Sequence, residues 1–152
     1  MTKGIVIHAP RPTDEMRKAE NAEYAEASGY HATEHIIIEG SNMVTGGVSQ
    51  DLGGISLGTS GLIFIYDGAI GGNGASRALY DRLEKAFERS LHIVKECPCT
   101  SEAGCPRCTF SYRCGNNNEF LHKKASNEIL QKINDGEITD IIEPTEGDRP
   151  LV

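Results

Sequence analysis

The stretch "ECPCTSEAGCPRCTFSYRCGNN", residues 96–117, contains all five cysteines of this 152-residue chain. They are Cys97, Cys99, Cys105, Cys108 and Cys114. The N-terminal sequence "MTKGIVIHAP" lacks the apolar segment of a signal peptide, and no apolar run is long enough for a transmembrane helix, so we expect a cytoplasmic protein. Clustered cysteines in the reducing cytoplasm bind metal ions more often than they form disulfides. The stretch therefore predicts a metal-binding lobe.

Structural zinc sites take four ligands in tetrahedral geometry. The pair Cys105 and Cys108, in the sequence CPRC, is the strongest unit, because two intervening residues let both sulfurs face one ion. Adding Cys99 and Cys114 completes the pattern Cys-x5-Cys-x2-Cys-x5-Cys, and we predict these four as the ligands. Cys97 is the alternative to Cys99, since side chains two apart in an extended segment share a face. Otherwise Cys97 is expected to act as a small buried hydrophobic residue.

Two other uses of the cysteines compete with zinc. An iron–sulfur cluster also takes four thiolates, and two disulfides with one free thiol would suit a secreted protein. The absence of a signal peptide in the sequence favours a metal, and we predict one structural zinc per chain. Because four protein thiolates leave no open coordination position, such a site stabilises the fold and catalyses nothing.

Hydrophobic patterning predicts an α+β domain over residues 1–133, with a small sheet flanked by helices and the cysteine lobe near its C-terminal end. The apolar run at residues 61–67 predicts a strand buried on both faces. Gly29 and Gly40 are expected to end helices. The strands are predicted at residues 3–10, 54–58, 61–67 and 137–143, and the helices at 14–27, 30–40, 75–96 and 119–133, the last capped by Asn117 or Asn118.

The charge is uneven along the chain. The net charge of −7 argues against general nucleic-acid binding, which depends on neutralising phosphates. Residues 84–133 nevertheless carry eight Lys or Arg and six Asp or Glu, while residues 134–152 form an acidic tail with six acids and one arginine. Basic residues interleaved with aromatic ones bind single strands by charge and stacking. The candidates for weak nucleic-acid contact are Arg107, Arg113, Lys123, Lys124 and Tyr112.

Two further motifs carry possible chemistry. The sequence HATEH places His31 and His35 one helical turn apart with Glu34 beside them, which is the arrangement of a zinc-dependent hydrolase with a glutamate base. The structural interpretation is that both histidines are hydrogen-bonded in the core or at a contact. The glycine-rich segment Gly68–Gly74, between a strand and a helix, either binds a phosphate or simply allows a tight turn.

The segment "CPCTSEAGCPRCTFSYRCGNNNEFLHKKAS", residues 97–126, resembles the C-terminal zinc-binding segment of MrfA-type and Hrq-type DEAD/DEAH-box DNA helicases. The upstream motifs HATEH, DLGGIS and IFIYDGAIGGNG occur in the family's order, so the resemblance runs from about residue 31 to 133. It implies a four-cysteine zinc module of a DNA-unwinding motor with roles in DNA repair. The matching residues are Cys97, Cys99, Gly104, Cys105, Pro106, Cys108, Ser111, Cys114, Gly115, Asn116, Asn118, Leu121 and Lys123, with Ala125 one place early.

The main departure from these helicases is the absence of the motor. It contains no P-loop motif G-x-x-x-x-G-K-[ST], and 152 residues are too few for two RecA-like lobes. We therefore expect a non-enzymatic accessory or adaptor module that contacts a DEAD/DEAH-type helicase or ATPase in trans, nucleic acid, or both. The alternative function is the metal-dependent hydrolase built on His31, Glu34 and His35.

Overall fold

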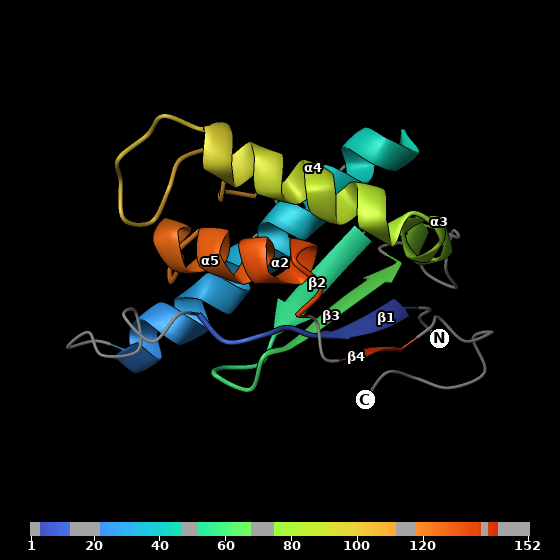
Figure 1. Ribbon diagram of the computed structural model, residues 1–152, viewed down its shortest axis with the longest axis horizontal. Coiled ribbons are helices and arrows are strands. Elements are labelled where there is room, and N and C mark those ends of the chain that lie inside the picture. The colour runs from blue at the N-terminus through green and yellow to red at the C-terminus, as the bar shows by residue number, and fades with distance from the viewer. Residues whose placement is uncertain are drawn as a thin grey trace.

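The computed structural model describes residues 4–12, 22–46, 52–67, 75–111, 118–137 and 140–142. A four-stranded antiparallel sheet in the order β2-β3-β1-β4 lies below a layer of helices, as Figure 1 shows. The predicted α+β class is therefore confirmed. The elements are β1 (Gly4–His8), α2 (Ala22–Thr45), β2 (Leu52–Ser56), β3 (Leu62–Asp67), α3 (Ala75–Asp81), α4 (Leu83–Glu96), α5 (Lys123–Asn134) and β4 (Asp140–Ile142).

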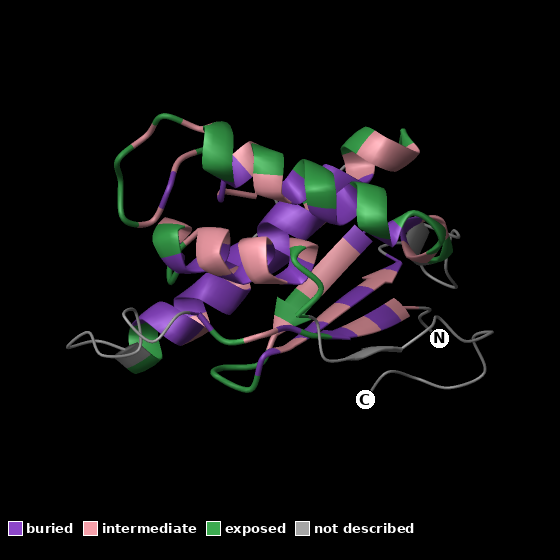
Figure 2. Cartoon of the chain, viewed as in Figure 1, coloured by how far each residue is buried: buried purple, intermediate pink, exposed green. Residues whose placement is uncertain are grey.

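Alternate residues of the central strands are buried beneath the helices. Ile5 and Ile7 of β1 and Ile63 and Ile65 of β3 are fully buried, while the residues between them are half-buried (Figure 2). The prediction that residues 61–67 are buried on both faces is wrong. The strand pairs antiparallel with its neighbours, and such sheets commonly pack only one face against the core.

Helix α2 runs without a break through both glycines that were expected to end helices. Each glycine instead lies where another helix crosses α2. A Cβ atom at Gly29 would lie 2.6 Å from Cβ of Ala125 in α5, and one at Gly40 would collide with Oγ of Ser90 in α4. The predicted helix ends are wrong because close helix packing, rather than chain termination, requires these glycines. Residues 14–21 of the first predicted helix lie outside the described residues.

The helix predicted at residues 75–96 is two helices, α3 and α4, which meet at Arg82. The backbone of Arg82 is not helical, with φ −130° and ψ 29°. Its side chain donates to the carbonyl oxygen of Val44 at 3.3 Å, at the end of α2. The change of direction lets α3 contact the sheet while α4 packs on α2 and α5.

Helix α5 begins four residues later than predicted. Its N-cap is His122, whose Nδ1 accepts a hydrogen bond from the amide of Ala125 at 3.1 Å. Asn118 has a different role, because its Oδ1 accepts from the amide of Ser111 at 2.6 Å. The predicted C-terminal strand is present as β4, which pairs with β1, so part of the predicted acidic tail belongs to the sheet.

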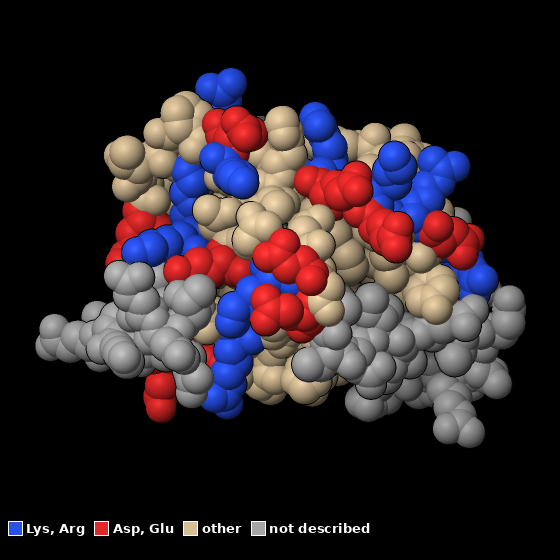
Figure 3. All heavy atoms as spheres, viewed as in Figure 1, with Lys and Arg blue, Asp and Glu red and all other residues tan. Residues whose placement is uncertain are grey.

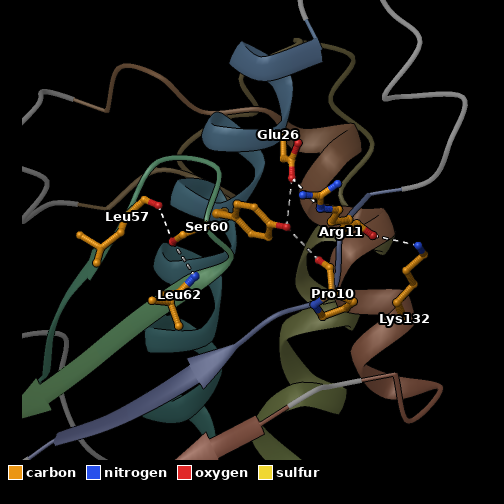
Figure 4. A network of polar contacts seen from close by, with 8 residues as sticks. Pro10, Arg11, Glu26, Leu57, Ser60, Leu62 and Lys132 are labelled. Carbon is orange, nitrogen blue, oxygen red and sulfur yellow. Dashed lines mark hydrogen bonds and ion pairs between the residues drawn. The ribbon is translucent and has the colours of Figure 1, made fainter.

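A polar network holds the chain after β1 against α2 and α5 (Figure 4). The buried hydroxyl of Tyr30 lies 3.3 Å from the carbonyl oxygen of Pro10 and 3.5 Å from Oε1 of Glu26. Glu26 also pairs with Arg11 at 3.7 Å, and Lys132 of α5 donates to the carbonyl oxygen of Arg11 at 2.8 Å. These contacts fix the sheet relative to the helices. None of the described helices is both long and apolar enough to cross a membrane.

Candidate metal centre

The cysteine cluster begins directly after helix α4. It ends at Glu96, and Cys97 is extended, with φ −70° and ψ 123°. The segment from Cys97 to Cys99 therefore turns both thiols toward the loop that carries Cys105 and Cys108. The Sγ atoms of these four cysteines all lie within 4.8 Å of one another, and the cysteines are free thiols. They form the one group of three or more metal-ligand side chains found among the residues that the structure describes.

The sulfur separations match those of a tetrahedral zinc site. The Sγ atoms of Cys97 and Cys105 are 3.5 Å apart, and Cys108 Sγ lies 3.8 Å from the Sγ atoms of both Cys99 and Cys105. Zinc–sulfur bonds of about 2.3 Å in a tetrahedron place the sulfurs roughly 3.8 Å apart. Both the chemistry and the spacing of the donor set therefore fit one zinc ion.

A tight backbone turn preorganises the CPRC unit. The amides of Cys108, Thr109 and Phe110 all donate to the carbonyl oxygen of Cys105, at 3.0 to 3.2 Å. The amide of Cys105 in turn donates to Sγ of Cys108 at 3.3 Å. Amide donors to a thiolate favour its charged form, so the turn supports metal ligation by Cys108.

The structure brings together three of the four predicted ligands, Cys99, Cys105 and Cys108. It also brings Cys97 into the same cluster, where the residue is half-buried rather than packed in the core. The fourth predicted ligand, Cys114, lies outside the described residues. The ligand role of Cys114 therefore remains a prediction.

The electrostatics of the thiols differ across the cluster. Burial raises the pKa of Cys99, but hydrogen bonds from Lys123 and from the other three cysteines outweigh it and lower the value to about 7. Burial raises the pKa of Cys108 to about 12, and its neighbouring thiols add to the rise while the Cys105 amide opposes it. A bound cation reverses this effect, because a metal-coordinated thiol is deprotonated. Metal-free protein is therefore expected to keep Cys108 protonated and Cys99 partly ionised near neutrality.

The cysteine loop is anchored to α2 through Thr109. The Thr109 hydroxyl donates to the carbonyl oxygen of Ala103 at 2.6 Å. The Thr109 carbonyl accepts from Nδ1 of His35 at 2.8 Å. Gly104 packs directly against the Thr109 side chain, because a Cβ atom at Gly104 would lie 2.8 Å from Cγ2 of Thr109. The loop, the turn and α2 are thus joined at one fully buried threonine.

The HATEH motif has structural contacts. Nδ1 of His31 donates to the carbonyl oxygen of Phe120 at 3.0 Å, and His35 binds Thr109 in the same way. Glu34 points elsewhere, since its Cγ lies 2.8 Å from the Cβ position of Gly54 in β2. Among the described residues, these three side chains are not part of a group of three or more potential metal ligands. The geometry therefore does not favour the hydrolase interpretation.

Burial shifts the pKa values of the two buried ionisable residues of this motif in opposite directions. Burial raises the pKa of Glu34 to about 8, so the folded protein keeps this proton near neutrality. Burial lowers the pKa of His35 to about 4, which the hydrogen bond to Thr109 opposes and the charge of His31 reinforces. Both side chains are therefore uncharged at pH 7. An uncharged Glu34 lacks the charge of a general base.

The Glu34 carboxyl contributes less to stability as pH rises from 6.5 to 8. From its ordinary value of 4.5 up to about 8, the folded state holds a proton that the unfolded state has lost, so stability decreases as pH rises. His35 acts in the opposite sense between about 4 and 6.5 and offsets Glu34 there. Relative to Glu34→Gln, zinc-saturated wild-type protein should lose about 2 kcal/mol from pH 6.5 to pH 8 in urea unfolding. The thiolate ligands bind zinc more strongly as pH rises, but they contribute equally to both proteins and cancel in this comparison.

The same change at the exposed Glu39 of α2 is the control, and Glu39→Gln should keep the pH dependence of the wild type. Equal pH dependence in the wild type and Glu34→Gln would contradict the assignment of a protonated buried carboxyl.

The described residues that were predicted to contact nucleic acid differ in their surroundings. Arg107 and Lys124 are exposed, Lys123 contacts the cysteine cluster, and Tyr112 and Arg113 lie outside the described residues. A cavity of about 520 Å³ lies between the end of α4 and the start of α5, and Lys123 and Lys124 are part of its lining. The other lining residues are Val94, Lys95, Cys97, Cys99, Thr100, Ser101, Glu102, His122 and Asn127. Figure 3 shows basic and acidic side chains interleaved on the face it displays. On this face the described basic side chains are therefore separated by acidic ones.

Lys123 and Thr109 are site residues whose roles the sequence analysis missed. The role of Lys123 depends on α5 starting beside the cluster, and the role of Thr109 depends on where the loop crosses α2. Neither position follows from spacing along the chain. The inclusion of Cys97 had a signal, because an extended Cys-Pro-Cys segment places both thiols on one face.

Comparisons with known proteins agree with this geometry. A family model for the MrfA Zn-binding domain, MZB, matches residues 33–109. The uncharacterized protein MJ1572.1 of Methanocaldococcus jannaschii is 40% identical over 111 residues, which cover 68% of this chain and 97% of that protein. The crystal structure of the DUF1998 helicase MrfA bound to DNA contains a similar fold, with a TM-score of 0.56 and 23% identity over 79% of this chain. This chain spans 16% of the helicase.

The family match and the four-thiol cluster together make this lobe a structural zinc site. The similarity to the solved helicase, at 23% identity, shows a shared fold.

Proposed function

The chain belongs to the MrfA zinc-binding domain family, and we propose from this premise that it is a non-enzymatic accessory module of a helicase-type DNA repair or DNA-processing system. The observation that carries the proposal is the cluster of four thiols at tetrahedral spacing. Four protein thiolates leave no coordination position for a substrate or a water molecule, so the zinc stabilises a surface rather than performing a reaction.

We propose that this surface contacts a DEAD/DEAH-type ATPase in trans. The 152 residues contain no P-loop, which supports a role beside a motor that supplies the ATP hydrolysis. The similar fold in MrfA is 16% of a helicase chain that is bound to DNA. A module with this fold is therefore suited to work together with such a motor.

For the zinc ligands, we propose Cys97, Cys99, Cys105 and Cys108. Their sulfur spacing supports this set, and the chelating Cys-Pro-Cys and CPRC units each supply two thiolates. Cys114, predicted from its symmetric spacing, is the alternative fourth ligand. Purified protein should be colourless and hold one zinc, whereas visible absorption would indicate an iron–sulfur cluster.

The partner proposal is tested with a DEAD/DEAH-type helicase from the same organism. Zinc-loaded protein should form a complex with the helicase in isothermal titration calorimetry and change its DNA-stimulated ATPase rate. Zinc-stripped protein serves as the matched control and should lose both effects, because the metal is coupled to the fold of the lobe. Absence of a complex and of any effect on ATPase would refute the accessory role in trans.

Single-stranded nucleic acid is expected to bind weakly. Exposed Arg107 and Lys124, with Lys95 beside the cavity and Arg113, neutralise about three or four phosphates, so the slope of log K against log salt should be about −2 to −3. The dissociation constant should be on the order of 10⁻⁵ M near physiological salt. Fluorescence anisotropy of a labelled single strand measures both quantities.

The double variant with Arg107→Ala and Lys124→Ala should reduce the salt slope by roughly one. Lys85→Ala changes an exposed lysine near the other end of α4 and should leave the slope unchanged. If wild-type protein shows no binding even at low salt, the basic residues face a protein partner instead.

A further inference from the structure

Lys123 is the first residue of α5, and its side chain reaches back to the cysteine segment. Its ammonium nitrogen lies 2.8 Å from the carbonyl oxygen of Cys97, 2.7 Å from that of Cys99 and 3.2 Å from Sγ of Cys99. An ammonium group has three N–H donors, and these three acceptors occupy all of them. We propose that Lys123 is an outer-sphere residue of the zinc site, which clamps the Cys97–Cys99 segment and offsets thiolate charge.

The charge balance of the site supports this role. Zinc with four thiolates carries a net charge of −2, and Lys123 is a cation in hydrogen-bond contact with one of the sulfurs. A charge-assisted hydrogen bond to a thiolate is stronger than a neutral one and draws electron density from the sulfur. Outer-shell groups of this kind tune the affinity of the ligands for the metal. Lys123 therefore reduces the repulsion among the four thiolates.

The position of Lys123 on its helix points to the same conclusion. The first turn of a helix is the positive end of its dipole, where acidic side chains are favoured and lysine is not. The first turn of α5 contains no acidic residue and begins with two lysines. The Cys97 carbonyl, at the C-terminal end of α4, belongs to the negative end of another helix dipole. Lys123 thus contacts both the negative end of α4 and a thiolate. These favourable contacts offset the unfavourable position of a cation at the positive end of α5.

The carbonyl contacts give Lys123 a second, geometric role. Two carbonyl oxygens on either side of Pro98 accept from one nitrogen, which holds the Cys-Pro-Cys segment in the extended form that presents both thiols to the metal. The backbone amide of Lys123 also donates to the carbonyl oxygen of Glu102 at 2.8 Å. The zinc lobe is therefore attached to α5 by both the side chain and the backbone of one residue.

Competition with a chromophoric zinc chelator tests the proposal. Lys123→Met keeps the apolar stem and removes the charge and the donors, and should weaken zinc binding by about 10- to 100-fold. Lys124→Met, its exposed neighbour, should bind zinc like the wild type. Lys123→Gln, which keeps an N–H donor without the charge, should fall between them. Cobalt-substituted Lys123→Met should shift its sulfur-to-cobalt charge-transfer bands to lower energy, an effect that loss of fold stability alone does not produce.

Zinc affinity of Lys123→Met within about twofold of Lys124→Met would overturn the proposal, since loss of an outer-shell partner of a metal ligand typically changes affinity by at least about tenfold. If Lys123→Met does not fold, Lys123→Gln decides alone, and wild-type affinity in that variant overturns it. The proposal rests on the zinc ligand set given under the proposed function. These measurements contain no helicase and no nucleic acid, so their failure is distinct from failure of the accessory role.

Discussion

Cys108→Ser is expected to abolish tight zinc binding and to unfold the loop between Cys97 and Phe110. Cys108 is the buried member of the cluster, 4% exposed, and its sulfur lies 3.8 Å from those of Cys99 and Cys105. A serine hydroxyl does not ionise near neutral pH and cannot replace the thiolate. Structural zinc contributes on the order of 10 kcal/mol to small metal-dependent folds, so loss of one ligand forfeits a large share of that stabilisation.

The measurement is zinc content after dialysis against a mild chelator, followed by hydrogen exchange of the loop. Cys114→Ser is the matched control, because the proposed ligands Cys97, Cys99, Cys105 and Cys108 already supply four thiolates. It should keep the zinc, and Cys97→Ser should lose it. The reverse outcome, with zinc lost from Cys114→Ser and kept by Cys97→Ser, would restore the symmetric ligand pattern predicted from the sequence.

The sequence predicted those parts of the fold that depend on local pattern. The apolar strands β1 and β3, the helical segment of α4 and the CPRC unit are each encoded within one segment, and all were found. Gly29 was misread because its meaning depends on Ala125, nearly a hundred residues away. A glycine that ends a helix and one that admits another helix look the same along the chain.

The metal site also has a part that local sequence predicts and a part that it does not. Four thiols within a short stretch indicate a metal site, because chelation depends on local spacing. Lys123 was predicted to contact nucleic acid, because a lysine beside an aromatic-containing loop has no local feature that marks it as a metal partner. Its contacts with Cys97 and Cys99 arise only when α5 packs beside the end of α4. Outer-sphere residues of this kind come from tertiary structure.

Gly104→Ala is expected to destabilise the zinc lobe by about 3 kcal/mol and to weaken zinc binding. Gly104 has φ +100°, a region that costs an L-residue about 1–2 kcal/mol. A Cβ atom there would also meet the Thr109 side chain, at 2.8 Å from Cγ2, in a fully buried place where overpacking costs about 1–3 kcal/mol. Thr109 cannot yield freely, because its hydroxyl binds Ala103 and its carbonyl accepts from His35.

Gly136→Ala separates the two causes. Gly136 has φ +89° but nothing within 4 Å of its Cβ position, so this variant should show the backbone cost alone, about 1–2 kcal/mol, with unchanged zinc affinity. Urea unfolding of zinc-saturated protein and chelator competition should therefore rank Gly104→Ala well below Gly136→Ala in both measurements. Equal losses in the two variants would mean that the Gly104–Thr109 contact does not hold the loop. Unequal losses would show that the loop reaches α2 through Thr109, and that the shape of the zinc lobe depends on a glycine next to its ligand Cys105.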